Sequence, residues 1–302
     1  MKAVVFGGSG FLGSHVADAL TAAGFQVVIF DCNKSPFLMD DQDMVVDDIM
    51  DSNQVMKSIK GADVVFHFAG VADIHKANEN PYETVRLNVL GTTIILDACV
   101  KADVNRFIFA SSVYVYSEHG GFYRSSKQAC ELLIENYNKL YDLNFTILRF
   151  GSLYGQRANE SNWIYNVIKQ ALTEGRIQRK GDGEEIREYI NVRDAAQACV
   201  DMTDDKYKNS YITLTGTQPI KIKDLMVMIR EMLGNKVEIQ YLDEYLEEHY
   251  EITPYSFRPN LAKKYVNNSQ IDLGQGLLDM IYDVYRDVNG SEEKNLPITP
   301  PE

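Results

Sequence analysis

The amino-acid sequence predicts an α/β protein built on a doubly wound parallel sheet, with a smaller C-terminal lobe interleaved with it. Two observations carry this prediction. In the first half of the chain, short apolar runs rich in β-branched and aromatic residues alternate with stretches of helical periodicity. These runs are apolar throughout rather than every second residue, which is typical of strands covered on both faces.

The expected elements of the first half follow one another in regular alternation. Strands are expected at Lys2–Gly8, Gln26–Asp31, Met44–Asp48, Asp63–Ala69, Arg106–Ser112 and Asn144–Phe150. Helices are expected at 11–23, 52–59, 80–101 and 123–141. In such a sheet the strands end at one edge, and ligands bind there.

Beyond Gly155 the alternation becomes less regular. The sequence predicts a helix at 162–173, a strand–helix unit at 188–204, strands at 210–215 and 236–242, and a helix at 273–286. We therefore expect a first domain over 1–155, to which 188–204 returns, and a smaller lobe over 156–288. Residues 289–302, which combine prolines with charges, are expected to form a mobile tail.

Composition narrows the classes of partner. The chain has 302 residues and a net charge of -13, so nucleic acid and anionic membranes are disfavoured as partners. The apolar run at the N-terminus is short and ends in glycines, so we interpret it as a strand and not as a signal peptide. Four scattered cysteines show no metal-ligand spacing, which predicts no metal site and a reducing, cytoplasmic location.

A glycine-rich turn follows the first strand and opens the first helix. Its sequence is Gly7-Gly8-Ser9-Gly10-Phe11-Leu12-Gly13. Glycines let backbone N–H groups approach a pyrophosphate at a helix N-terminus, where the helix dipole favours negative charge. This arrangement predicts the Rossmann dinucleotide site. The candidate contacts in the turn are Gly7, Ser9, Gly10, Phe11, Leu12 and Gly13.

The second strand ends in an acidic residue, Asp31, 18 residues beyond Gly13. A carboxylate there can accept hydrogen bonds from the adenosine ribose and would repel a 2′-phosphate. The sequence therefore favours NAD over NADP as the cofactor, with Asn33 as a further contact.

Three residues form a candidate catalytic set. Ser112 ends a strand at the ligand edge, and Tyr123 and Lys127 share one face of the next helix because they are four residues apart. An ammonium group near a phenol favours the phenolate. Tyr123 could then take a proton from a hydroxyl whose carbon loses hydride, while Ser112 bonds to the same oxygen. Lys127 is also expected to hold the nicotinamide ribose.

These features resemble the extended short-chain dehydrogenase/reductases, the NAD-dependent nucleotide-sugar epimerase/dehydratase family, over residues 1–290. Further motifs that carry the resemblance are Val46–Ile49, Phe66–Gly70, Asn88–Thr92, Ser111–Tyr116, Leu148–Gly155 and Gly181–Ile190. The resemblance implies a homodimer and several site residues. Asp48 and Ile49 would contact adenine, and Phe68, Ala69 and Gly70 would line the dinucleotide. Arg187 and Arg258 would hold the pyrophosphate of a nucleotide sugar, with Ser152 and Trp163 as further substrate contacts.

The sequence departs from the family pattern at the site itself. Ten residues separate Ser112 from Tyr123, where the family has a longer loop. Val113 and Tyr114 stand where the family's 4,6-dehydratases carry an acid pair, and Ser152 replaces a frequent asparagine. Dehydration is disfavoured because no carboxylic acid is present to protonate the departing hydroxyl.

Three functions remain open at this point. The first is a nucleotide-sugar 4-epimerase, in which hydride leaves C4 and returns to the other face. The second is a 4-dehydrogenase that releases a 4-ketosugar, its NAD regenerated by an external acceptor. The third is a non-enzymatic NAD-sensing module, which an intact Ser–Tyr–Lys set disfavours. The nucleotide base and the sugar cannot be inferred from the sequence.

Overall fold

The computed structural model describes residues 1–242, 263–265 and 271–289. The chain divides into two compact units. Of the described residues, the first unit comprises 1–150, 195–214 and 263–265, and the second comprises 151–194, 215–242 and 271–289.

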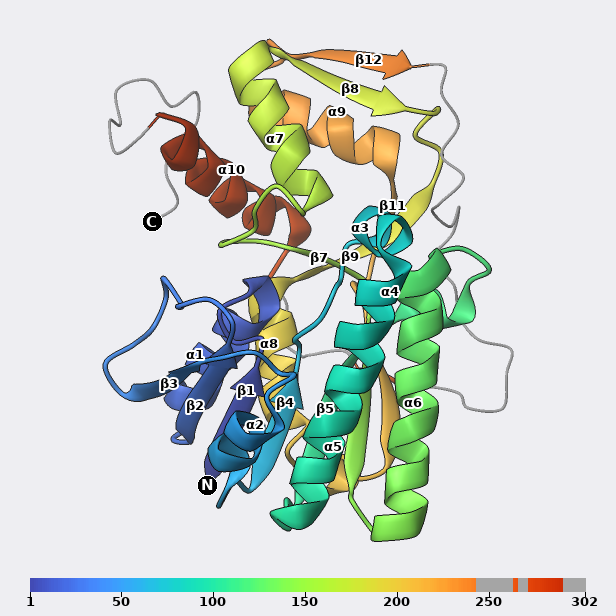
Figure 1. Ribbon diagram of the computed structural model, residues 1–302. Coiled ribbons are helices and arrows are strands. Elements are labelled where there is room, and N and C mark those ends of the chain that lie inside the picture. The colour runs from blue at the N-terminus through green and yellow to red at the C-terminus, as the bar shows by residue number, and fades with distance from the viewer. Residues whose placement is uncertain (243–262, 266–270, 290–302) are drawn as a thin grey trace. The chain divides into compact units, whose positions relative to one another are not determined.

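The first unit is built on an eight-stranded sheet in the order β13-β10-β6-β5-β4-β1-β2-β3 (Figure 1). Every neighbouring pair is parallel. The strands are β1 (Lys2–Phe6), β2 (Gln26–Asp31), β3 (Gln42–Val46), β4 (Val64–His67), β5 (Arg106–Ser112), β6 (Phe145–Phe150), β10 (Ser210–Leu214) and β13 (Lys263–Lys264). The predicted doubly wound fold class is confirmed.

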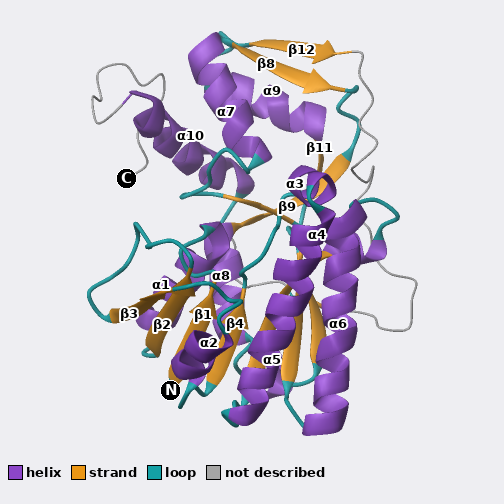
Figure 2. Cartoon of the chain, viewed as in Figure 1, coloured by secondary structure: helices purple, strands orange, loops and turns teal. Residues whose placement is uncertain are grey.

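Helices cover both faces of this sheet, with α2, α5 and α6 on one face and α1 and α8 on the other (Figure 2). The helices and helical turns are α1 (Phe11–Ala22), α2 (Ser52–Ile59), α3 (Ile74–Glu79), α4 (Pro81–Thr84), η1 (Val85–Leu90), α5 (Gly91–Lys101), η2 (Val113–Tyr116), α6 (Gly121–Tyr141), α8 (Val192–Asp201) and η3 (Asp205–Tyr207). Aspartate side chains cap three of them: Asp51 accepts the N–H groups of Asn53 and Gln54, Asp73 accepts that of Lys76, and Asp204 accepts that of Lys206.

Two expected elements differ in detail. The helix expected over 80–101 is α4 and α5 joined by η1, a π-helical turn, so the 3.6-residue period is broken in its middle. The strand expected at Met44–Asp48 is β3, which starts earlier and stops at Val46. Side chains of Asp47 and Asp48 accept hydrogen bonds from nearby backbone N–H groups, which turns the chain out of the sheet.

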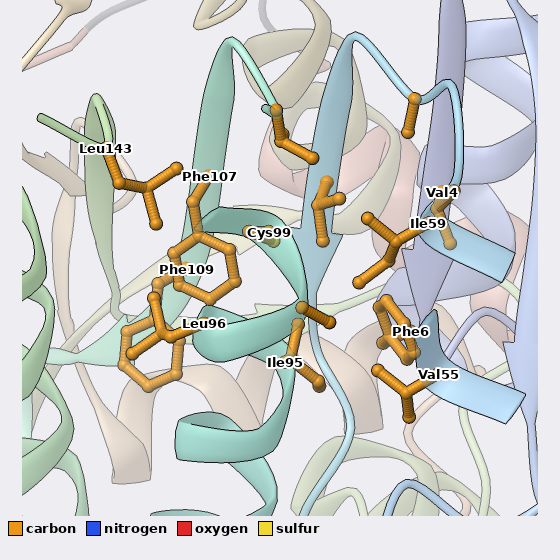
Figure 3. Close-up of a cluster of buried hydrophobic side chains, with 14 of the residues drawn as sticks. Val4, Phe6, Val55, Ile59, Ile95, Leu96, Cys99, Phe107, Phe109 and Leu143 are labelled. Atoms are coloured by element: carbon orange, nitrogen blue, oxygen red, sulfur yellow. The ribbon is translucent and has the colours of Figure 1, made fainter. Parts of the chain in front are cut away.

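A hydrophobic core fills the space between the sheet and the helices α2, α5 and α6 (Figure 3). Phe6 and Phe30 lie 4.8 Å apart between ring centroids, and Phe107 and Phe109 stack at 6.3 Å. From α5, Ile95 and Leu96 are fully buried against these strands. The helices are thereby held on the sheet by apolar contact.

The second unit contains smaller sheets. One has the strand order β11-β9-β7, and the other pairs β12 with β8 in parallel. The strands are β7 (Ser152–Tyr154), β8 (Arg176–Lys180), β9 (Ile186–Asn191), β11 (Pro219–Lys221) and β12 (Glu238–Leu242). The helices are α7 (Trp163–Glu174), α9 (Ile222–Met232) and α10 (Leu273–Asn289). Four of these elements were not expected from the sequence, namely β7, β8, β11 and α9. The three strands are short or of mixed pattern, whereas α9 has helical spacing in Ile222, Leu225, Met226 and Ile229 that could have predicted it.

Two sequence-based expectations fall outside the described residues. Arg258 is one, and the other is the predicted mobile tail, of which only Asn289, at the end of α10, is described. In the described part of the chain, no helix is both long enough and apolar enough to cross a membrane.

The core predicts where stability resides. Leu96→Ala should lower the free energy of unfolding by about 2–5 kcal/mol, because it leaves a cavity beneath α5. The control is Leu38→Ala. Because Leu38 is 37% exposed, this variant should change the free energy of unfolding by less than about 0.5 kcal/mol. Urea unfolding of both variants checks this expectation, and equal effects would contradict it.

Candidate active site

The glycine turn is held in a shape that other residues could not adopt. Gly7 has φ +79, in the left-handed region, and a Cβ on it would lie 2.5 Å from the backbone nitrogen of Ala69. A Cβ on Gly13 would lie 2.1 Å from the carbonyl oxygen of Gly7. Both contacts are far too short for real atoms, so these positions require glycine.

The N-terminus of α1 fits a pyrophosphate. Among the described residues, Gly10 occupies its N-cap without a side-chain hydrogen bond, and no acid lies in the first turn. The first N–H groups of a helix have no partner within it, and the helix dipole makes this end positive. By contrast, α2 and α3 have aspartate caps, which an anion would have to displace. The helix end that follows the glycine turn is therefore open to a phosphate group.

The acidic residue at the end of β2 lies beside the turn. Asp31 accepts the N–H of Ser9 through Oδ2 at 3.0 Å and the N–H of Asn33 through Oδ1 at 2.9 Å. The Ser9 hydroxyl donates to the Asn33 carbonyl at 2.7 Å. Each carboxylate oxygen can accept a second bond, so Asp31 keeps capacity for ribose hydroxyls. The structure thus brings Ser9, Asp31 and Asn33 together.

The remaining candidate cofactor contacts fall into two groups. Phe68 and Ala69 both donate backbone N–H groups to the Phe6 carbonyl, which places the segment through Gly70 beside the glycine turn. Asp48 is exposed, whereas Ile49 is buried and its side chain packs against Gly91 at the start of α5. Ile49 therefore contributes chiefly to the core, and Asp48 is the more accessible of the two.

The candidate catalytic residues gather where β5 ends and α6 begins. Ser112 ends β5, and its Oγ accepts the Tyr114 N–H at 3.3 Å. The Lys127 ammonium donates to the Ala110 carbonyl at 2.8 Å and lies 5.8 Å from the ring centroid of Tyr123. Burial lowers the pKa of Lys127, while Cys130 and Glu131 oppose that shift. A buried cation near a phenol is the arrangement that favours phenolate.

The ten-residue connection between Ser112 and Tyr123 is closed by local contacts. Gly120 and Gly121 have φ +96 and +48, so the chain reverses through left-handed backbone before α6. The Asn78 side chain accepts the Phe122 N–H at 3.1 Å. The rings of Tyr114 and Tyr123 meet edge to face at 6.2 Å. Tyr114 therefore supports the face of Tyr123.

No role for Asn88 follows from the sequence beyond its place in the motif Asn88–Thr92. From the π-helical turn η1, its amide accepts the Val71 N–H at 2.7 Å and donates to the Val71 carbonyl at 3.0 Å. It also donates to the Ser126 hydroxyl at 2.9 Å, beside Lys127. Asn88 thus ties the loop after β4 to α6. No sequence pattern predicts the π-helical turn η1, which sets the direction of the Asn88 side chain.

His67 does not join the acid–base chemistry. Its Nε2 lies 2.9 Å from the Thr92 hydroxyl, and its ring is surrounded by Phe6, Phe107 and Phe109. Burial, and then the charge of Lys127, lowers its pKa to about 3. The imidazole is therefore neutral near pH 7 and is a packed residue of the core.

The predicted substrate contacts other than Ser112 that the structure describes lie in the second unit. Ser152 on β7 pairs with Tyr189 on β9, and Arg187 lies on that same strand β9, 7% exposed, with Nη1 donating to the Ile186 carbonyl. Trp163 opens α7, and the Arg179 guanidinium lies 5.3 Å from its ring centroid. In the part of the chain that is described, no cluster of His, Cys, Asp or Glu could hold a metal ion.

A comparison with known sequences agrees with the dinucleotide site described above. Residues 3–211 match the profile of the NAD dependent epimerase/dehydratase family. The chain belongs to that family. It is therefore identified as an enzyme of a family that depends on NAD, and the predicted family and cofactor are confirmed.

Individual relatives share both sequence and fold. A Methanocaldococcus jannaschii protein named "Putative UDP-glucose 4-epimerase" is 30% identical over 260 residues, which cover 79% of this chain and 84% of that protein. The UDP-glucose 4-epimerase of Thermotoga maritima, solved with UDP-glucose, has a TM-score of 0.84 at 22% identity, covering 95% of this chain and 100% of that one. The UDP-N-acetylglucosamine 4-epimerase of Methanobrevibacter ruminantium M1 has a TM-score of 0.83 at 24% identity, with coverage of 95% and 98%.

Asp31 gives the site a testable cofactor preference. Asp31→Asn keeps an acceptor for backbone N–H groups but removes the charge that would repel a 2′-phosphate. We expect the ratio of NAD to NADP affinity to fall about tenfold, the equivalent of one charge-assisted hydrogen bond of about 1.5 kcal/mol. Calorimetric titration with both cofactors measures it. Asp43→Asn, which removes an exposed charge from the neighbouring strand β3, should leave the ratio unchanged.

Proposed function

We propose that this protein is an NAD-dependent nucleotide-sugar 4-epimerase. The observation that carries the proposal is the buried Lys127 ammonium, which lies 5.8 Å from the ring centroid of Tyr123 and binds the Ala110 carbonyl near the end of β5, the strand that ends in Ser112. The set lies in the same unit as the glycine turn and Asp31, so cofactor and acid–base residues belong to one sheet.

In the proposed reaction each residue has a separate task. NAD, when bound, supplies the acceptor for the hydride that leaves C4 of the sugar and its donor on return. Tyr123, as phenolate, takes the proton of the C4 hydroxyl and gives it back to the inverted alcohol. Ser112 hydrogen-bonds the same oxygen, and Lys127 keeps the phenolate favoured through its charge. Protons and electrons therefore balance without net oxidation.

The residues after Ser112 support epimerisation over dehydration. Val113 is apolar and 1% exposed, and Tyr114 is engaged with the ring of Tyr123. Neither offers a carboxylic acid that could protonate a departing hydroxyl. The names of several relatives, among them a Thermodesulfobacterium geofontis UDP-glucuronate 4-epimerase, also favour chemistry at C4.

The proposed substrate is a sugar linked to a nucleoside diphosphate. Arg187 supports it, because a buried guanidinium can pair its planar fork with phosphate oxygens. Ser152 and Trp163 are the proposed contacts to the sugar and the nucleotide. Arg258 is proposed as a second phosphate contact from family resemblance.

The alternative is a 4-dehydrogenase, favoured by the short connection after Ser112 if that connection lets the ketosugar leave. The two functions are separated by NMR of the protein with NAD and a panel of UDP-, GDP- and CDP-sugars in deuterated water. A sugar inverted at C4 without deuterium uptake supports the epimerase. A ketosugar that accumulates only with an added hydride acceptor supports the dehydrogenase instead.

Tyr123→Phe tests the acid–base assignment. Because only the hydroxyl is removed, kcat should fall by about 10²- to 10⁴-fold while the NAD affinity stays near that of the wild type. Steady-state kinetics and calorimetry measure the two quantities. Tyr137→Phe, farther along α6, is the control and should keep kcat. Full activity in Tyr123→Phe would reject the assignment.

We also propose a homodimer. Large apolar side chains stay exposed along α4, η1 and α6, namely Tyr82, Val85, Leu90, Leu132, Leu140 and Tyr141. Exposed apolar side chains on neighbouring helices can be buried when two helix pairs meet across a two-fold axis. The free state of all four cysteines, three of them fully buried, supports the proposed cytoplasmic location.

Leu132→Glu tests the dimer. The side chain is 61% exposed, so the isolated chain tolerates the change, but a charge in an apolar interface should shift the protein to monomers. Light scattering after size-exclusion chromatography reports the mass. Leu38→Glu, which lies outside α4, η1 and α6, should leave the mass unchanged. A wild-type monomer at micromolar concentration would rule the dimer out.

A further inference from the structure

One face of α6 carries more than the two candidate catalytic residues. Tyr123, Lys127 and Glu131 follow one another at intervals of four residues, so they lie in a row along the helix. Lys127 binds the carbonyl of Ala110 on β5, and Glu131 binds the next residue of the same strand, Ser111. Two successive turns of α6 are thereby attached to the strand that ends in Ser112.

The Glu131 carboxylate is buried, and both of its oxygens accept hydrogen bonds. It accepts the Ser111 hydroxyl at 2.6 Å and two N–H groups of Arg149, at 3.0 Å from Nε and 2.7 Å from Nη2. The side chains of Arg149 and Glu131 are only 4% and 9% exposed. A two-pronged pair of this kind fixes both the distance and the angle between its partners.

Arg149 extends the contact to three further elements. It lies on β6 directly beside Ser111 in the strand register, so both side chains reach the same carboxylate. Its guanidinium also lies 4.4 Å from the ring centroid of Tyr116 and 4.6 Å from that of Tyr211. Tyr116 belongs to η2, in the short connection after Ser112, and also accepts a hydrogen bond from Arg149.

We propose that Glu131, with Arg149, is a positioning residue that holds Ser112 and Tyr123 at their working separation. The proposal rests on the function proposed above. Arg149 anchors the connection behind Ser112 through Tyr116, while Glu131 joins α6 to the residue in front of Ser112. The ion pair therefore links both sides of the serine to the helix that carries the tyrosine and the lysine.

The attachment through Glu131 and Arg149 is important because the connection between Ser112 and Tyr123 is short. Ten residues lead from Ser112 to Tyr123, and two of them are glycines in left-handed conformations, so local sequence alone gives little rigidity. A misplacement of about 1 Å can cost roughly 100-fold in rate. A buried charge pair with three further contacts supplies the constraint that the connection lacks.

The test compares matched variants of the NAD-loaded protein. Glu131→Gln keeps the volume and an acceptor for Ser111 but loses the charge, and Arg149→Lys keeps the charge but loses the fork. We expect each to lower kcat at least about tenfold, with KM and NAD content within about twofold of the wild type. The double variant should be no slower than the slower single variant, because the pair acts as a unit.

Arg106→Lys is the control. Arg106 is equally buried, with a side chain 5% exposed, but lies at the opposite end of β5, where it binds Thr146 and the Met202 carbonyl. Arg106→Lys should lower the melting temperature of the protein and leave kcat unchanged. If Glu131→Gln yields no folded protein, Glu131→Asp takes its place, with the same expectation because its shorter side chain cannot reach both partners.

Equal kcat in the wild type and the Glu131 and Arg149 variants overturns the proposal, as does a loss shared with Arg106→Lys. Crystal structures of NAD-loaded wild type and Glu131→Gln give a readout without substrate. The distance from Ser112 Oγ to the Tyr123 hydroxyl should change by at least about 0.5 Å. An unchanged distance overturns positioning, whereas a changed distance in a protein inactive on every nucleotide sugar supports positioning and rejects the proposed function.

Discussion

Parallel pairing is the constraint on which the rest of the structure depends. When all strands run the same way, all of them end at one edge, and the loops that follow must meet there. The glycine turn follows β1, Asp31 ends β2, the segment through Gly70 follows β4, and Ser112 ends β5. Residues far apart in sequence thus reach one edge because of strand direction, before any specific contact forms between them.

Burial then decides what each group at this edge can do. Burial lowers the pKa of Lys127, but its side chain donates a hydrogen bond to the Ala110 carbonyl, and the Glu131 carboxylate, one turn away, opposes the shift. His67, nearby and equally buried, has no such partner for a cation and is neutral. Because desolvating a charge is costly unless it is paired, the network around Glu131 also determines which neighbour can carry a positive charge.

The parts of the structure that could be predicted from the sequence are those encoded by neighbouring residues. The buried strands, the glycine turn and the pairing of Tyr123 with Lys127 each need only a short segment. Asn88 could not be placed, because its direction depends on a π turn that has no sequence signature. Nor could the pair of Glu131 and Arg149, whose meeting depends on strand register. In the second unit, short strands such as β7 and β11 are defined by their partners and not by their own pattern.

The fold and the Ser–Tyr–Lys set do not determine whether the reaction is an epimerisation or a dehydrogenation, so the outcome depends on other residues. Removal of hydride from C4 and its return to the opposite face make the same demands on Tyr123 and Ser112, so the acid–base residues cannot distinguish an epimerase from a dehydrogenase. The outcome depends on whether the ketosugar turns over before it leaves. A nucleotide held by groups remote from the reacting carbon, as Arg187 is proposed to do, retains the ketosugar through that interval while leaving its ring free to rotate. In the proposed function, epimerisation thus depends on how the nucleotide is held, and Ser112, Tyr123 and Lys127 are proposed to supply the chemistry common to both reactions.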